Sequence, residues 1–211
     1  MSYSDTECDG GLMCYLASKN GQLGYLKHAH KQGCPWDQWT CRLAAMNGHL
    51  ECLKYAHEKG CSWDEWTCHY AAKNGQFECL KYAHEKGCPW DKLTCRYAAK
   101  NGHLECLKYA HKNGCPLEEG TCHFAATSGH PECLKYAHEQ GCPWDILTCH
   151  LAAINGNIEC LHYAWKNGCE WNAVGEERGA LIRRMVREIY WPKLRHRFNM
   201  LLLVRWWQFK L

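Results

Sequence analysis

The stretch Gly33–Lys59, GCPWDQWTCRLAAMNGHLECLKYAHEK, decides the fold because the chain repeats it. Further copies follow at a constant spacing of 27 residues and begin at Gly60, Gly87, Gly114 and Gly141. A divergent copy precedes them, and a partial copy begins at Gly168. Self-similarity at such a period is typical of a solenoid, in which each unit packs mainly on its neighbours. Positions within each copy are numbered here from its first glycine.

The copy Gly60–Lys86 predicts two short helices. Asp64 is a good N-cap for the first helix, because a carboxylate can accept a backbone N–H of the first turn. Gly75 ends this helix, since glycine readily adopts the left-handed conformation found after helices. A second helix is expected over about Gln76–Glu85, where apolar residues recur on one face. With almost no strand pattern, the chain predicts an all-α solenoid of helix-turn-helix units.

Stacking of the copies must create the core, because one short helix pair cannot bury its own apolar face. Ala44 and Ala45, at positions 12 and 13, are expected to let neighbouring helices approach closely. The 18 cysteines follow the repeat at positions 2, 9 and 20, with Cys8 alone outside the pattern. Without a secretory signal pattern, free thiols that pack as small apolar residues are favoured over a disulfide framework.

The segment AAMNGHLECLKYAHEKG, residues 44–60, resembles the ankyrin repeat. The residues that match the family pattern are Asn47, Gly48, His49, Leu50, Glu51, Lys54, Glu58 and Gly60. The resemblance extends over about residues 6–175. It implies an ankyrin-like stack of helix pairs that binds a protein partner on its concave surface.

Two features depart from the ankyrin pattern. Trp39–Arg42 reads WTCR where the family has TPLH, so cysteine takes the place of a core leucine. The copy is also about six residues shorter than the usual repeat, and the loss falls where the family forms a projecting β-hairpin. A compact array without long fingers is therefore expected. Such short Cys-Pro-Trp-Asp copies resemble the ankyrin arrays of giant DNA viruses and some protists.

The sequence divides into five parts. They are a tail at 1–5, an N-terminal capping repeat at 6–32, five repeats at 33–167, a partial repeat at 168–175 and a basic amphipathic segment at 176–211. Residues 1–175 carry 16 Lys and Arg against 19 Asp and Glu, whereas residues 176–211 carry 9 against 3. The repeats are therefore mildly acidic, which disfavours nucleic-acid binding by the array.

The basic segment 176–211 contains an apolar stripe that includes Leu181, Met185 and Ile189, opposite several arginines. A helical cap over the last repeat, a docking helix for a partner and a membrane-surface helix all fit this pattern. The cap is favoured, because the terminal units of a solenoid need covering. The other two interpretations stay open.

The many cysteines and histidines do not form a metal-binding or catalytic pattern. No C-x-x-C pair occurs, and Gln76 and Asn157 stand where other copies have histidine, so a ligand at this position would be lost in two copies. A nucleophile needs one prepared environment, whereas these residues recur in every copy. We therefore expect no metal, no cofactor and no enzymatic activity.

Some recurrent positions favour a structural role over a functional one. Position 10 forms a cationic row of Arg42, His69, Arg96, His123 and His150. Both residue types donate hydrogen bonds, and the resemblance implies that they bind the backbone between units. The tryptophans at positions 4 and 7, such as Trp36 and Trp39, are expected to pack the turns.

Positions that vary among otherwise similar copies are the candidates for partner recognition. Position 6 holds Gln38, Glu65, Lys92, Glu119 and Ile146, and position 14 holds Met46, Lys73, Lys100, Thr127 and Ile154. Eight residues separate the two positions on one helix, so they lie close to the same face. The resemblance implies that this face belongs to the concave surface.

The sequence thus predicts a non-catalytic scaffold that binds a protein partner, of unknown identity, through the first helix of each repeat. A membrane-surface or anionic-lipid adaptor acting through residues 176–211 is the alternative. No signal-peptide pattern and no apolar run of ~20 residues occurs. A cytoplasmic location is therefore expected, in the host cell if the source is viral.

Overall fold

The computed structural model describes residues 11–169, which form twelve α-helices and no strand. Their bounds are α1 Leu12–Lys19, α2 Leu23–Lys31, α3 Gln38–Met46, α4 Leu50–Glu58, α5 Glu65–Lys73, α6 Phe77–Glu85, α7 Lys92–Lys100, α8 Leu104–Lys112, α9 Glu119–Ser128, α10 Pro131–Glu139, α11 Ile146–Ile154 and α12 Ile158–Lys166. The predicted all-α solenoid is confirmed. The tail predicted at 1–5 and the basic segment predicted at 176–211 lie outside the described residues.

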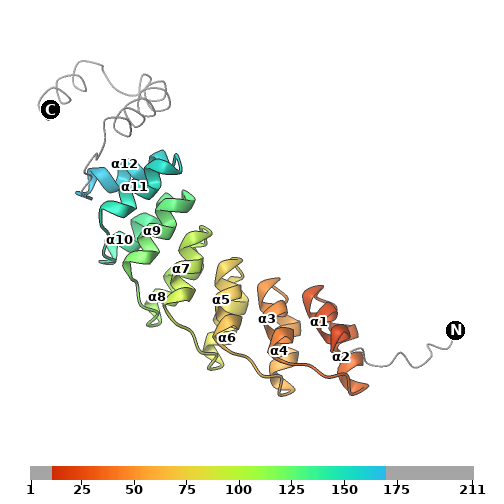
Figure 1. The fold of residues 1–211 in the computed structure, drawn as a ribbon. Coiled ribbons are helices and arrows are strands. Elements are labelled where there is room, and N and C mark those ends of the chain that lie inside the picture. The colour runs from red at the N-terminus through yellow and green to blue at the C-terminus, as the bar shows by residue number, and fades with distance from the viewer. Residues whose placement is uncertain (1–10, 170–211) are drawn as a thin grey trace, which may run out of the picture.

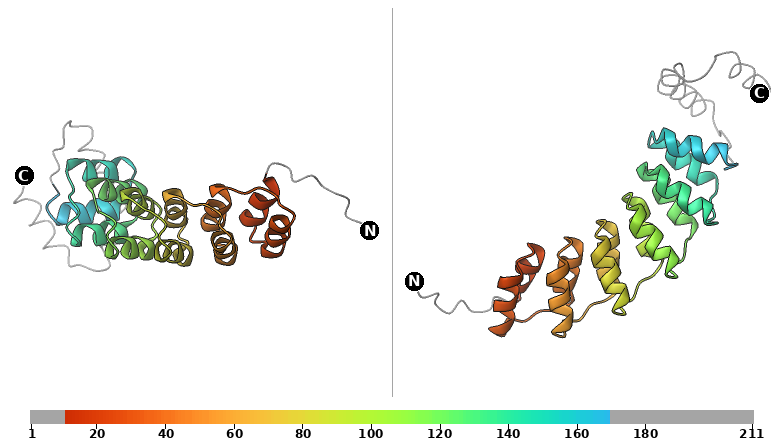
Figure 2. Two further views of the ribbon diagram at one scale, coloured as in Figure 1. Left: turned by 90° about the horizontal axis from the view of Figure 1, so that it is seen from below. Right: turned by 180° about the vertical axis from the view of Figure 1, so that it is seen from behind.

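The helices pair in order, and the six pairs stack in one curved row (Figure 1). The odd-numbered helices, which come first in each copy, are called the inner helices; the even-numbered ones are called the outer helices. Figure 2 shows the same row from below and from behind. Each inner helix packs on the next inner helix and on the outer helix of its own copy. The core is therefore made by stacking, as the repeat length requires.

The inner helices begin at the predicted N-cap. Asp37 and Asp91 each accept a hydrogen bond from the backbone N–H two residues later, at 2.8 Å. Asp64 also occupies the N-cap position of α5, but its side chain makes no bond to the helix. Its carboxylate is bound instead by Arg42 of the preceding copy. The local capping role is thus exchanged for a contact between repeats, as it is at Glu118, which binds Arg96 and does not cap α9.

Gly75 follows the end of α5, the first helix of its copy. It has the left-handed conformation that the sequence predicts, with φ of +70°. A side chain there would also collide with the next copy, because an added Cβ atom would lie 2.5 Å from the imidazole Nδ1 of His103. Gly21, Gly48, Gly102 and Gly129 have positive φ angles and meet the side chain at position 17 of the next copy in the same way. Glycine is therefore required both by the turn and by the contact between repeats.

Small residues fill the seam between neighbouring inner helices. Ala71 and Ala72 of α5 are fully buried, as are Ala44 and Ala45 of α3. The predicted close approach of the helices is thus confirmed. Sixteen cysteines within residues 11–169 are buried free thiols, and they fill the same core. Cys34, which takes part in a disulfide, is the exception to the expected free thiols.

Candidate protein-binding surface

The cationic row at position 10 connects each copy to the start of the next inner helix. Arg42 binds the Asp64 carboxylate, and Arg96 donates to Glu118 at 2.5 Å. His69 and His123 contact Asp91 and Asp145 through Nε2, each at 2.8 Å. The structural interpretation of this position is confirmed, but the expected backbone acceptor was wrong. The acceptors are the carboxylates at position 5 of the following copy.

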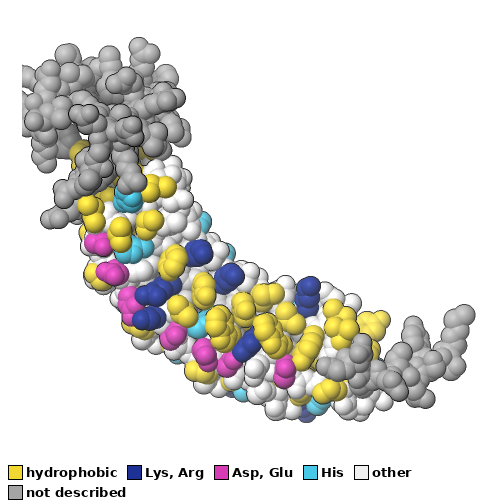
Figure 3. All heavy atoms as spheres, viewed as in Figure 1, with side chains coloured by type: hydrophobic (Ala, Val, Ile, Leu, Met, Phe, Trp, Pro, Cys, Tyr) yellow, Lys and Arg dark blue, Asp and Glu magenta, His cyan; other side chains and the backbone are white. Residues whose placement is uncertain are grey.

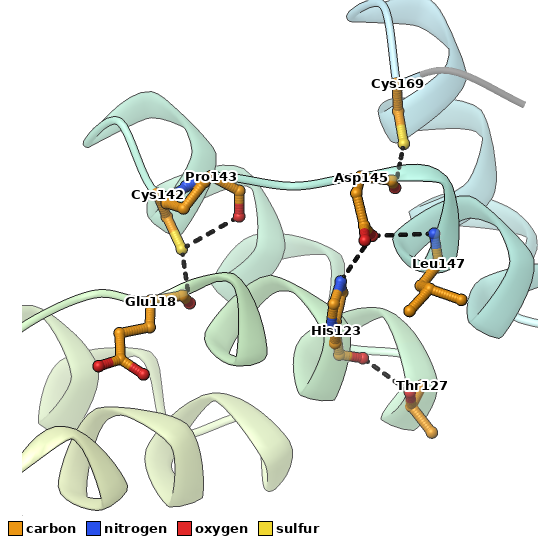
Figure 4. A network of polar contacts seen from close by, with 8 residues as sticks. All are labelled: Glu118, His123, Thr127, Cys142, Pro143, Asp145, Leu147 and Cys169. Atoms are coloured by element: carbon orange, nitrogen blue, oxygen red, sulfur yellow. Dashed lines mark hydrogen bonds and ion pairs between the residues drawn. The ribbon is translucent and has the colours of Figure 1, made fainter.

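Asp145 shows how many contacts converge on one such carboxylate (Figure 4). It accepts a hydrogen bond from the backbone N–H of Leu147 at 2.9 Å, besides the contact with His123. Its own carbonyl accepts the thiol of Cys169 at 3.0 Å. Burial alone would raise the pKa of Asp145, but the hydrogen bonds and the charge of His123 outweigh it and lower that pKa below its usual value. The carboxylate therefore stays ionised and fixes the start of α11.

The hydrogen bond to backbone between copies is made at position 17 instead. His49 Nε2 lies 3.0 Å from the carbonyl oxygen of Lys19 in the preceding copy. Asn157 donates from Nδ2 to the carbonyls of Ala126 and Thr127, at 2.8 and 2.7 Å. An amide can thus replace the imidazole at this position, because both supply a suitable N–H. A metal ligand could not be replaced in that way.

The thiols and imidazoles of the described part do not assemble a reactive site. Within residues 11–169, no group of three His, Cys, Asp or Glu side chains is placed to hold a metal ion. Burial raises the pKa of the Cys79 and Cys106 thiols to about 12, so both stay protonated near neutral pH. Protonated, buried thiols are poor nucleophiles. These two thiols pack in the core of the array.

The tryptophan at position 4 lies in the turn before the inner helix, as the sequence predicts, and its ring packs against the outer helices. The imidazole of His30 stacks on Trp36 with the ring centroids 3.9 Å apart, and its Nδ1 lies 3.0 Å from the hydroxyl of Tyr55. Equivalent stacks join His57 to Trp63, His84 to Trp90 and His138 to Trp144. One ring cluster therefore separates the outer helices in four of the copies.

The structure places the predicted recognition residues at opposite ends of the inner helices. Those at position 6 form the first turn, where Gln38, Glu65, Lys92 and Glu119 are exposed and Ile146 is half-buried. Those at position 14 lie in the last turn, where Lys73, Lys100 and Ile154 are exposed and Met46 and Thr127 are half-buried. Eight helical residues span about 12 Å. The two sets therefore form two separate rows rather than one cluster.

Apolar side chains occupy the surface between the two rows, and sequence reasoning missed them. We call positions 7 and 11 the apolar row: Trp39, Leu43, Trp66, Tyr70, Leu93, Tyr97, Phe124, Leu147 and Leu151. Trp39, Phe124 and Leu147 are 43%, 37% and 48% exposed. Trp39 was expected to pack a turn, and this was wrong: it lies on the face of α3, with the Arg42 guanidinium 4.7 Å from its ring centroid.

Figure 3 shows this face as a band of hydrophobic side chains that runs the length of the array. In that view Asp and Glu side chains gather toward the outer edge of the curve, whereas Lys and Arg side chains lie both at the inner edge and beside the acidic ones. The signal was present in the sequence, because positions 7, 11 and 14 are spaced i, i+4 and i+7 and so share one helix face. Their recurrence in most copies made them look like core.

These features define a class of protein: an α-helical repeat scaffold with a continuous exposed face and, in the part of the chain that the structure describes, no assembled reactive site. The chain belongs to the ankyrin-repeat family. A family model of ankyrin repeats in many copies matches residues 41–84, and one of three ankyrin copies matches residues 68–146 and 95–175. Ankyrin repeats generally mediate protein–protein interaction.

Among solved structures, the human ASB11 ankyrin repeat domain is similar, with a TM-score of 0.66 at 20% sequence identity. The match covers 81% of this chain and 96% of that domain. At this identity the likeness supports the fold alone. Comparison with curated proteins gave no significant match. Among residues 11–169, no helix is both long and apolar enough to cross a bilayer.

Proposed function

We propose that this protein is a non-catalytic scaffold that binds a protein partner through the face of its inner helices. The observation that carries the proposal is the apolar row, which leaves Trp39, Phe124 and Leu147 open to solvent. Large contiguous apolar patches are uncommon on monomeric proteins and mark interaction sites. The stack does not need these side chains, because its core is filled below them by alanine, cysteine and leucine.

The rigid support beneath the row favours binding without rearrangement. Asp91 and Asp145 at position 5 each cap an inner helix and are held by a histidine of the preceding copy. The glycine turns at the other end are covered by position 17 of the next copy, as Gly75 is by His103. A surface fixed at both ends loses little conformational entropy when a partner binds.

The variable residues at positions 6 and 14 flank the apolar row and would set specificity. Glu65 and Lys92 are exposed at one edge, and Lys73 and Lys100 at the other. Charged groups at the edge of an interface select partners and steer association more than they add affinity. The apolar row would thus supply most of the binding free energy, and the flanking rows would choose the partner.

An affinity capture from lysate, followed by mass spectrometry, tests this proposal. The full chain is compared with the double variant Trp39→Gln/Phe124→Gln. Tyr25→Gln is the control, because Tyr25 is 66% exposed but lies on the outer helix α2. The inner variant is expected to lose the captured partner, while the control keeps it. Equal capture by both variants would show that the partner binds elsewhere.

A second variant separates specificity from affinity. Lys73→Ala/Lys100→Ala removes two charges at position 14 without touching the apolar row. Exposed charge pairs contribute about 0.2–1 kcal/mol each, so this variant is expected to weaken capture partially and to make it less sensitive to salt. A salt dependence identical to that of the unchanged chain would remove these lysines from the binding surface.

A further inference from the structure

We infer that the partner presents an α-helix that lies along the array across the inner helices, with acidic residues on the flank that meets Lys73 and Lys100. This inference rests on the proposed function and names the chemistry of its partner. Two observations carry it, the absence of a sheet edge in residues 11–169 and the distribution of charge beside the apolar row, together with the general spacing of packed helices.

A helix suits this face better than an extended peptide. An extended peptide needs partners for its backbone N–H and C=O groups, which it obtains by pairing with the edge of a sheet. Residues 11–169 contain no strand, so they offer no such edge. Each buried backbone group without a partner would weaken binding, whereas a helix satisfies its own backbone.

The separation of the copies matches the repeat of a helical surface. Packed helices are about 8–10 Å apart, and seven residues of a helix rise about 10.5 Å. A helix that lies along the array can therefore place one apolar side chain on each copy at every seventh residue. Tyr70 and Tyr97, at position 11 of adjacent copies, are two such contact points, and both are half-buried.

The positive charge of Lys73 and Lys100 beside the apolar row favours a partner helix with acidic residues on the flank that meets them. The ammonium of Lys73 lies 5.9 Å from the ring centroid of Tyr97, and that of Lys100 lies 5.4 Å from the ring of Phe124. Within residues 11–169, neither lysine forms an ion pair with a carboxylate. Both are therefore exposed cations held in place by cation–π contacts.

The opposite edge of the apolar row, formed by position 6, carries exposed negative charge. Glu65 and Glu119 are exposed there, while Lys92 of the same row is paired with Glu118 at 3.3 Å. Among the five repeats at 33–167, position 14 is lysine only in the second and third, and Met46, Thr127 and Ile154 stand there in the others. The partner helix should thus carry two acidic residues about seven positions apart on one flank.

Designed peptides test the inference on the full chain. One fluorescein-labelled helical peptide carries leucine at heptad core positions, glutamate on one flank and glutamine on the other. A second is identical except that lysine replaces glutamate. Fluorescence anisotropy is expected to show about tenfold tighter binding of the glutamate peptide, from two charge pairs gained and two repulsions avoided. Equal binding, or binding of neither peptide, would overturn the inference.

Charge reversal on the protein locates the contact. Lys73→Glu/Lys100→Glu should remove or invert the preference for the glutamate peptide. Lys81→Glu/Lys135→Glu is the matched control, because it makes the same charge change at exposed residues of the outer helices α6 and α10. Circular dichroism checks that each variant is folded. An equal response of both variants would mean that the peptides sense only the net charge.

Failure of this inference can be told from failure of the proposed function. If neither peptide binds but Trp39→Gln/Phe124→Gln still loses the partner captured from lysate, the inner face binds a protein that is not an acidic helix. If that variant keeps its partner, the inner face is not the binding surface, and the proposed function falls together with the inference.

Discussion

The inner and outer helices differ in what separates one copy from the next. Between inner helices the seam is made of small side chains such as Ala71 and Ala72, which are fully buried. The ring clusters lie between the outer helices. In one of them the His84 ring stacks on Trp90, and His84 Nδ1 lies 3.1 Å from the hydroxyl of Tyr109. The seam between the inner helices is thus filled by small groups and that between the outer helices by large rings.

This difference assigns separate tasks to the two layers. The histidines at position 25 and the tryptophans at position 4 stack on one another and space the outer helices. The inner layer buries the small residues in its seam and leaves the apolar row exposed on its other face. The exposed apolar row therefore belongs to the inner helices, whereas the ring clusters lie between the outer helices.

Overpacking the inner seam should give the largest effect. Ala72→Leu adds three carbons at a fully buried site between α5 and its neighbour, and the free energy of unfolding should fall by ~1–3 kcal/mol. Urea denaturation followed by circular dichroism measures the change. Lys73→Leu, one residue further along and exposed, is the control and should stay within about 0.5 kcal/mol. A similar loss in both variants would mean that the seam is not tightly packed.

Exchanging the outer spacer should have a smaller effect, and its sign should depend on the copy. Trp90→Leu removes the ring that stacks on His84 at 3.7 Å, and should lower the free energy of unfolding by about 1 kcal/mol. Leu117 occupies the equivalent place in the next copy, beside His111. Leu117→Trp should therefore stabilise the protein. Thermal melts of both variants decide the point: a loss of stability in each would show that the fourth copy has no room for the ring.

The architecture could be predicted from the sequence because the same helix-start, helix-end and packing residues recur from copy to copy. The helix bounds follow from Asp64 and Gly75 and their equivalents, and the tight seam follows from paired alanines. Each is a local rule that depends on one residue type and its spacing. The resemblance to ankyrin repeats pointed the same way, and the family match agrees with it.

The partners of individual side chains could not be predicted in the same way. Position 10 binds a carboxylate that is 22 residues away in the chain, as Arg42 binds Asp64. That pairing depends on how copies stack, and the sequence of a single copy does not contain it. The apolar row was missed for a related reason, because a recurrent Trp39 or Tyr70 resembles core until its exposed side is seen. The recognition role of positions 6 and 14 stays a prediction.

The fourth copy should be the weakest part of both layers. It has Leu117 in place of the outer spacer, Gly120 within α9, and Glu118 as an N-cap whose side chain does not bond to the helix. Glycine within a helix costs about 1 kcal/mol relative to alanine. Amides of Gly114–Gln140 should therefore exchange hydrogen faster than those of the other internal copies, measured by mass spectrometry on the full chain. Uniform protection over residues 33–167 would contradict this.

The smallest expected effect is a loss of stability on mild acidification, which begins in the outer layer. Burial, and then the charge of Lys86, hold the pKa of His57 below its ordinary value of 6.5, with Glu58 opposing them. Burial also lowers the pKa of His103 and His162. Because the unfolded chain binds these protons more readily, stability falls as the pH drops from above 6.5 toward the folded pKa values.

Comparison of two pH values isolates this contribution. The urea midpoint should be lower at about pH 5.5 than at about pH 7.5, and His57→Phe should reduce the difference while keeping a ring against Trp63, whose centroid lies 3.6 Å from that of His57. Asp145 does not interfere, because its lowered pKa places its titration below this range. If His57→Phe leaves the pH dependence unchanged, the acid sensitivity arises at His103 or His162, and the outer stack at Trp63 tolerates a charged imidazole.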